Sequence, residues 1–220
     1  MGTLGTFGGR GRRLTVSENQ SRGRLKGTVA TLCLALALGG CASALSGGDK
    51  AVPTFDLTAP NDFSVPNSGR GQLVIAMPTA LQVLDTERIV VEPASGQITY
   101  LNKAQWGDRL PALFQARLIE SFENGSRARA VARADSAITA DYLLLTDIRT
   151  FGIQTFGGGP EAVVEVSAKI VGNNSGRIAA AQVFRARVAA GGTDGVQATQ
   201  ALDQASDEVF VAIVRWAASR

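Results

Sequence analysis

The chain has 220 residues, of which 22 are Lys or Arg and 19 are Asp or Glu, and it contains no His. The lack of His excludes the commonest general base, the commonest zinc ligand and every catalytic pair that needs an imidazole. The formal charge of +3 comes from the N-terminus: the first 40 residues hold six basic and one acidic residue, so 16 basic and 18 acidic residues remain and their formal charge is −2. The charge therefore gives no reason to expect nucleic-acid binding.

The first feature along the chain is an apolar run at residues 27–38, preceded by basic residues. Its length is typical of a secretory signal and too short for a helix that spans a bilayer. Leu38-Gly39-Gly40-Cys41 follows and is similar to a bacterial lipobox, in which small residues precede the cysteine that is acylated. We predict cleavage between Gly40 and Cys41 and lipidation, with palmitate among the acyl groups, of the Cys41 thiol. An ordinary signal peptide and a short anchor helix are the alternatives.

This interpretation divides the chain into a lipoprotein signal peptide (1–40), a tether of small and polar residues (41–53) and a single domain (54–220). The only other cysteine, Cys33, lies in the apolar run and is removed with it. The mature chain then keeps Cys41 alone, and an acylated cysteine cannot form a disulfide.

The first part of the domain is predicted to form short strands. Apolar or alternating segments occur at 54–57, 72–77, 88–91 and 97–101, and the last two flank a Pro93–Gly96 turn typical of a hairpin. A helix then begins near Asp108, with Pro111 in its first turn. Its apolar residues recur at helical spacing and end before Asn124-Gly125; they are Leu110, Leu113, Phe114, Leu118 and Phe122.

The second part is predicted to be a meander of three long strands at 142–156, 161–171 and 177–189, joined by Gly- and Asn-rich turns. In the last strand, Ile178 and Phe184 are expected to face inward. A final helix runs from about Asp194 to Ala218. Its apolar stripe consists of Leu202, Ala205, Val209, Ile213 and Trp216.

These elements predict an α+β fold in one domain. We expect a two-layer sandwich with a mixed, mostly antiparallel sheet of six to seven strands and two main helices on one face. No phosphate-binding loop, dinucleotide fingerprint or EF-hand spacing occurs in the sequence, so no cofactor and no metal site is expected.

Several segments of the domain together resemble a known protein family, although none of them is specific enough alone. They are Phe55-Asp56-Leu57, Leu84-Asp85-Thr86-Glu87-Arg88-Ile89, Ile98-Thr99-Tyr100-Leu101, Ala104-Gln105-Trp106-Gly107-Asp108-Arg109-Leu110-Pro111, Phe184-Arg185-Ala186-Arg187 and Val214-Arg215-Trp216.

In this order and spacing, the chain resembles the auxiliary lipoproteins of ABC transport systems that carry MCE (mammalian cell entry) proteins, the family of the paraquat-inducible C lipoprotein. The resemblance implies a non-enzymatic periplasmic component that works with a permease, an ATPase and an MCE protein. The implied task is to move lipids or other hydrophobic molecules between the inner and outer membranes. Ala42 and Ser43 after the lipidated cysteine favour the outer membrane, because the inner-membrane retention signal of enteric bacteria is Asp in the second position.

Trp106 and Arg109 are the candidate partner-interface residues, since Trp and Arg are favoured at the energetic centres of interfaces. The structural alternative is that Trp106 fixes the start of the helix to the sheet while Arg109 is solvated or paired. Two other functional classes remain for the whole chain. One is an envelope scaffold, for instance a regulator of cell-wall synthesis. The other is an enzyme, but the sequence contains no nucleophile motif and no paired carboxylate motif that would support it.

Overall fold

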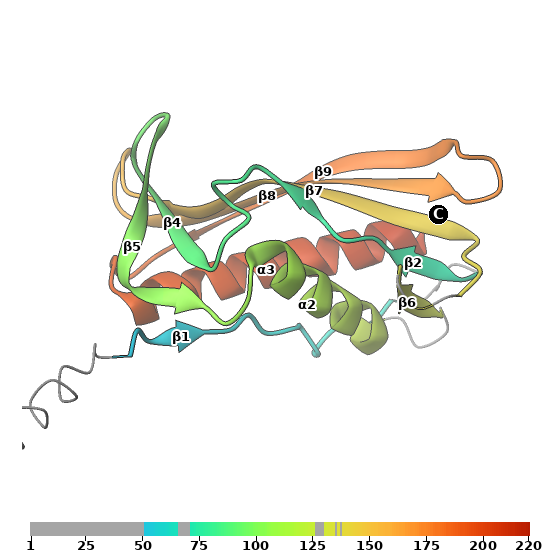
Figure 1. Ribbon diagram of the computed structural model, residues 1–220, viewed down its shortest axis with the longest axis horizontal. Helices are drawn as coiled ribbons and strands as arrows, with labels where there is room; N and C mark the ends of the chain where they lie inside the picture. Colours follow the sequence, from blue (N-terminus) through green and yellow to red (C-terminus); the bar gives the residue numbers. More distant parts are fainter. Residues whose placement is uncertain (1–50, 66–70, 126–129, 135, 137) are drawn as a thin grey trace, which may run out of the picture. The chain divides into compact units, whose positions relative to one another are not determined.

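The computed structural model describes residues 51–65, 71–125, 130–134, 136 and 138–220. Within these ranges one mixed sheet of nine strands is covered on one face by two helices, α2 (Leu110–Gly125) and α3 (Gly195–Ala218) (Figure 1). The strands are β1 (Thr54–Phe55), β2 (Leu73–Ile75), β3 (Thr79–Ala80), β4 (Arg88–Ala94), β5 (Gln97–Trp106), β6 (Val131–Arg133), β7 (Tyr142–Gln154), β8 (Glu161–Gly172) and β9 (Ile178–Ala189).

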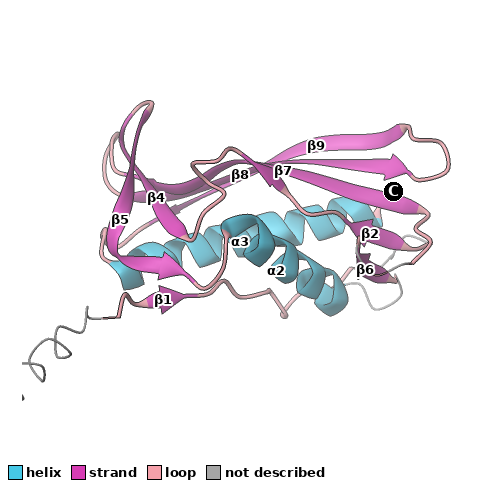
Figure 2. Cartoon of the chain, viewed as in Figure 1, coloured by secondary structure: helices cyan, strands magenta, loops and turns pink. Residues whose placement is uncertain are grey.

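The predicted α+β class, the mixed sheet and the two helices on one face are confirmed (Figure 2). The predicted number of six to seven strands is wrong, because the described residues form nine. The additional strands include β3 and β6, which are two and three residues long. Strands this short cannot show the period-2 alternation from which a strand is recognised in a sequence.

The sheet is organised around β7. One edge of β7 pairs with β8 in antiparallel fashion along almost its full length. The other edge is shared by three short parallel strands: β2 pairs with its first residues, β3 with its middle and β4 with its end. Strands β8 and β9 continue the sheet on the β8 side, and β5, β1 and β6 extend it on the other.

The core lies between the sheet and the helices. Every residue of the two predicted helical stripes is buried, and Phe114 of α2 packs against Phe210 of α3 with ring centroids 4.8 Å apart. Trp216 of α3 contacts Phe184 of β9 edge to face at 5.5 Å. Helix α3 starts as predicted, since the Asp194 carboxylate accepts hydrogen bonds from the N–H groups of residues 196 and 197.

The segment between β1 and residue 65, which we call the strap, is joined to both helices. Asp56 forms an ion pair with Arg117 of α2 at 2.5 Å, and Thr58 donates two hydrogen bonds to Asp203 of α3. The strap ends against Gly125, where any side chain would collide with the ring of Phe63, since an added Cβ would lie 2.3 Å from it. Residues Val52–Arg220 thus form one compact unit, and the predicted boundary between tether and domain stays a prediction.

Beside the strap, Asp207 gives the fold a pH dependence. Its Oδ1 atom is buried and has no hydrogen-bond partner within the described part of the chain. Burial, together with the negative charge of Asp203 one helical turn earlier, raises the pKa of Asp207 from 3.8 to about 6. Folding therefore favours the neutral form of this carboxyl group relative to the unfolded chain.

We expect the contribution of Asp207 to the free energy of unfolding to fall as the pH rises from about 4 to about 6, because the folded chain then has to ionise a buried carboxyl group. Asp207→Asn should be more stable than the parent by about 1 kcal/mol at pH 7, a value reduced for partial exposure, and equal to it below pH 4. Urea unfolding at both pH values measures the difference. Glu208→Gln, on the exposed side of α3, is the matched control and should show no such pattern.

Candidate functional site

Of the predicted site residues, two lie outside the described part of the chain, one is buried in the core and one lies at the surface. Gly40 and Cys41 lie outside the described residues, so the predicted cleavage and lipidation are not placed by the structure. Trp106, at the end of β5, is 1% exposed, and its ring contacts Phe151 of β7 edge to face with centroids 5.9 Å apart. This is the position expected of a residue that fixes the start of α2 to the sheet. The Trp106 side chain is not part of the surface of the domain.

Arg109, by contrast, lies at the surface just before α2. Its side chain is 61% exposed and binds the Asp85 carboxylate with two nitrogens, Nε at 3.0 Å and Nη2 at 2.6 Å. An exposed pair with this geometry contributes about 1 kcal/mol or less to stability. Its main effect is to fix the loop that contains Asp85 against the start of the helix.

Backbone hydrogen bonds join the same two segments. The Trp106 N–H donates to the carbonyl of Glu87 at 2.7 Å, and the Leu110 N–H donates to the carbonyl of Thr86 at 3.2 Å. A third segment joins at Tyr100, whose ring lies 3.6 Å below the Arg88 guanidinium carbon. The segments around residues 84–89, 98–101 and 104–111, which are separate in sequence, therefore meet in one place.

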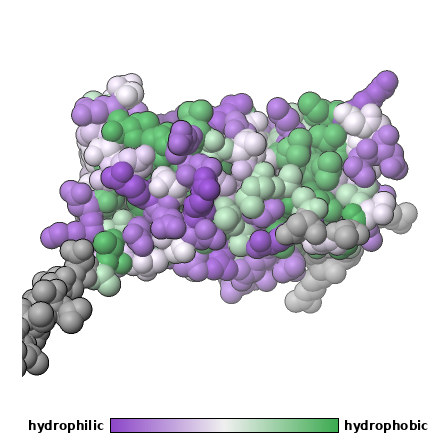
Figure 3. All heavy atoms as spheres, viewed as in Figure 1, coloured by the Kyte–Doolittle hydropathy of each residue, from purple (hydrophilic) through white to green (hydrophobic). Residues whose placement is uncertain are grey.

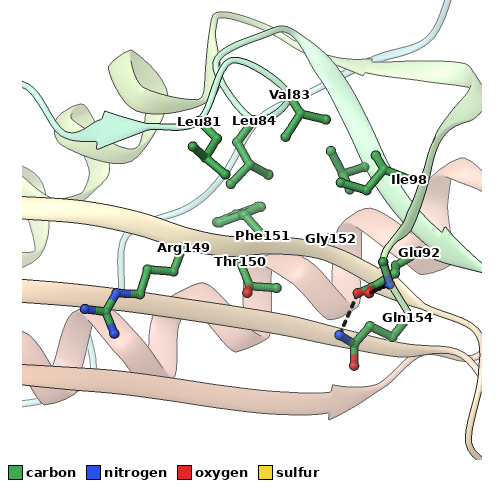
Figure 4. Close-up of a pocket in the computed structure, with 12 residues that line it drawn as sticks. Leu81, Val83, Leu84, Glu92, Ile98, Arg149, Thr150, Phe151, Gly152 and Gln154 are labelled. Atoms are coloured by element: carbon green, nitrogen blue, oxygen red, sulfur yellow. Dashed lines mark hydrogen bonds between the residues drawn. The ribbon is translucent and has the colours of Figure 1, made fainter. Parts of the chain in front are cut away.

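Next to this junction an apolar pocket of about 190 Å³ opens between the loop before β4, the β4–β5 hairpin and β7 (Figure 4). Its floor is formed by β7, one wall by the loop before β4 and the other wall by the β4–β5 hairpin. The apolar residues of the lining are Leu81, Val83, Leu84, Val90, Ile98 and Phe151, with Gly152 between them.

Gly152 sets the depth of this pocket. A Cβ atom there would lie 2.7 Å from the carbonyl oxygen of Val90, so only glycine lets β4 approach β7 this closely. The parallel pairing of β4 with β7 brings the hairpin over the floor, since Val90 pairs with Gly152. The walls are thus held by the sheet itself.

The polar groups at the two ends of the pocket already have partners. At one end, Gln154 Nε2 donates to Glu92 Oε2 at 2.8 Å, and Gly96 N–H donates to Glu92 Oε1 at 3.1 Å. At the other end, Arg149 lies 3.7 Å from carboxylate oxygens of both Asp147 and Glu165. Figure 4 shows its guanidinium pointing away from the apolar side chains.

A second hollow of similar volume lies further along β7, between Met77, Leu145 and Lys169. It is more open, and Asp147 and Ser167 also line it. Figure 3 shows apolar residues at the surface in two areas, one toward the β4 side and one over β2 and β7. The chemistry that these two hollows offer is the binding of apolar groups.

Within the described ranges no three His, Cys, Asp or Glu side chains are grouped so as to hold a metal ion.

Sequence reasoning missed this pocket, although a signal for it exists. Residues 81–84 contain three large apolar side chains between two strands, at a place where a loop is normally polar. Leu81 is 70% exposed.

In the described part of the chain, no helix has the length and apolar character needed to cross a membrane.

Comparison with known proteins gives a consistent result. The model of a family described as the ABC-type transport auxiliary lipoprotein component matches residues 55–214. The uncharacterised protein bll6063 of Bradyrhizobium diazoefficiens is 34% identical over 166 residues, which make up 74% of this chain and 44% of that protein. The chain therefore spans less than half the length of this relative.

Two solved structures share the fold. The crystal structure of protein XCC0632 from Xanthomonas campestris has a TM-score of 0.66 and 26% identity, and the match covers 74% of this chain and 93% of that one. A second crystal structure, of an uncharacterised protein, has a TM-score of 0.61 and 14% identity, covering 74% of this chain and 97% of the other. The second likeness concerns the fold alone.

Proposed function

This chain belongs to the family of ABC-type transport auxiliary lipoprotein components, and from that premise we propose that it is the lipid-anchored accessory subunit of an MCE-type ABC transporter. It would help to move lipids or other hydrophobic molecules between the inner and outer membranes without catalysing a reaction. The observation that carries the proposal is the family match over residues 55–214, which follows the lipobox-like sequence that ends at Cys41 after the short segment 42–54.

The anchor in this proposal is a lipidated Cys41 at the periplasmic face of the outer membrane, favoured by Ala42 and Ser43 at the next positions. A flexible tether of about twelve residues has a root-mean-square reach of roughly 20 Å. Such a subunit can hold a partner near the bilayer surface but cannot itself bridge the periplasm. Its partners would be an MCE-domain protein, a permease and an ATPase.

The docking residue that we propose on the domain is Arg109. It is exposed, it belongs to the junction of three segments beside the pocket, and its ion pair with Asp85 holds the guanidinium in one position. Arginine that is fixed in this way loses little conformational freedom when it binds a partner.

The test is co-purification of the transporter from solubilised membranes, with an affinity tag placed after Arg220. We expect the MCE protein, the permease and the ATPase to be recovered with the parent chain. Arg109→Glu should reduce their recovery at least fivefold, because truncating or reversing a central interface arginine costs on the order of 1–2 kcal/mol or more. Arg177→Glu, a charge reversal at an exposed turn, is the matched control and should not reduce recovery.

The variant Asp85→Ala distinguishes direct contact between Arg109 and the partner from an effect of Arg109 on the position of the loop that contains Asp85. If Arg109 touches the partner directly, this variant keeps most of the recovery although the ion pair is gone. Recovery of cell-wall synthases instead of transporter subunits with the parent chain would contradict the proposed function and favour the envelope-scaffold class.

A further inference from the structure

We propose that the pocket between the loop 81–84, the β4–β5 hairpin and β7 binds a single hydrocarbon chain of a lipid. This inference rests on the proposed function and adds to it that this subunit contacts the transported molecule itself. The cavity of about 190 Å³ is larger than the cavity of about 150 Å³ that accepts benzene in a protein core. It can therefore hold a stretch of an alkyl chain.

The first argument is the lining. The floor residue Phe151 is 2% exposed, and Leu84 and Val90 beside it are buried as well. Figure 4 shows Leu81, Val83 and Leu84 on one side and Ile98 on the other, all directed toward the space above Phe151. An occupant of this space meets apolar groups on three sides, which favours a ligand that is itself apolar.

The second argument is that the charged groups of the lining and Gln154 are already engaged. Glu92 is paired with Gln154 and with the Gly96 N–H, and Arg149 is flanked by two carboxylates. The edges of β4 and β7 that meet at the floor are paired with each other. A peptide strand placed in this apolar space would lose the hydrogen bonds of its own backbone groups to water. A hydrocarbon chain has no such groups to satisfy.

The third argument is the mouth of the pocket. Leu81 is 70% exposed and Ile98 is 49% exposed, and they stand on opposite walls. Single exposed apolar residues are common, but two that face each other across an apolar cavity form a continuous surface that a ligand can cover. The loop that carries Leu81 is held by the Asp85–Arg109 ion pair, and a pocket formed in advance binds with a smaller entropic cost.

The experiment uses the full mature chain, extracted into an amphipathic polymer so that no detergent competes. The probe is a lysophosphatidylcholine whose acyl chain ends in a diazirine, with a fatty acid bearing the same photoreactive chain as the second arm. After illumination, mass spectrometry should locate the label within residues 81–84, on Ile98 or on Phe151. Mapping the label on the parent chain requires no variant.

The double variant Leu81→Asp, Ile98→Asp should reduce labelling about tenfold, because two carboxylates at the mouth would have to be desolvated by the chain. Both positions are exposed, so the variant should fold. Ile178→Asp on β9, where the side chain is 58% exposed, is the matched control and should label like the parent. Labelling by the lysophospholipid points to a phospholipid source and labelling by the fatty acid alone to a free fatty acid; either result supports a hydrocarbon site.

A label that maps outside the pocket, or labelling that is unchanged in the double variant, would overturn the inference. Co-purification with the transporter is measured on the same proteins. If recovery persists while the pocket is not labelled, the proposed function stands and only the lipid site is wrong. If the parent chain recovers no transporter subunit, the proposed function fails whatever the probe does.

Discussion

Cys41→Ala is expected to move the protein completely from the membrane fraction to the soluble fraction and to abolish the incorporation of radiolabelled palmitate. Each methylene group buried in a bilayer contributes about 0.8 kcal/mol, so the acyl chains of a modified cysteine supply the whole of the attachment. Fractionation after a carbonate wash, together with intact-mass analysis of the mature N-terminus, measures the effect.

The chain supplies its own control for this experiment. Cys33 lies inside the apolar run and is predicted to be removed with it, so Cys33→Ala should leave both attachment and palmitate incorporation unchanged. An ordinary signal peptide would give a soluble protein with or without Cys41. A short anchor helix would leave Cys41→Ala on washed membranes with its first forty residues attached, and that outcome would contradict lipid anchoring.

Trp106→Ala should have the largest effect on stability, a loss of about 3–5 kcal/mol in the free energy of unfolding. The side chain is 1% exposed and packed on Phe151, so its removal leaves a cavity where the end of β5, the start of α2 and β7 meet. For a domain of this size the loss corresponds to a fall of roughly 6–20 °C in the melting temperature. Thermal unfolding followed by circular dichroism measures it.

Two variants separate packing from partner binding at this place. Trp106→Phe keeps an aromatic ring in the core and should recover a large part of the stability, with transporter recovery near that of the parent. Arg109→Ala removes only an exposed ion pair and should change the free energy of unfolding by about 1 kcal/mol or less. A Trp106→Ala protein that melts like the parent but no longer binds the transporter would show that the tryptophan acts at an interface instead.

The long elements could be predicted because their signals are local. The stripe of α3 and its cap at Asp194 are visible within one segment, and the alternation of β8 and β9 extends over most of each twelve-residue strand. Local signals fail where the register changes. Ile178 was expected inside but is 58% exposed, because the β8–β9 ladder shifts between Ile170 and Val171 and turns its side chain to the other face.

The remaining features depend on contacts between distant segments. Strands β3 and β6 are recognisable only through their partners, β7 and β2. The pocket exists because β4 pairs with β7 as well as with β5, which places Ile98 above Phe151; the sequence indicates the hairpin but not what it lies on. The burial of Trp106 is decided by that same distant strand.

The central position of β7 has a consequence for how the chain matures during synthesis and export. Strands β2, β3 and β4 all precede β7 in the sequence, and all three use it as their pairing partner. A polypeptide that emerges from its N-terminal end cannot build this part of the sheet until residue 154 has appeared. Until then the first half has only pairings of its own, such as the β4–β5 hairpin. The pairing of β2, β3 and β4 with β7 then depends on closing long loops, which slows folding.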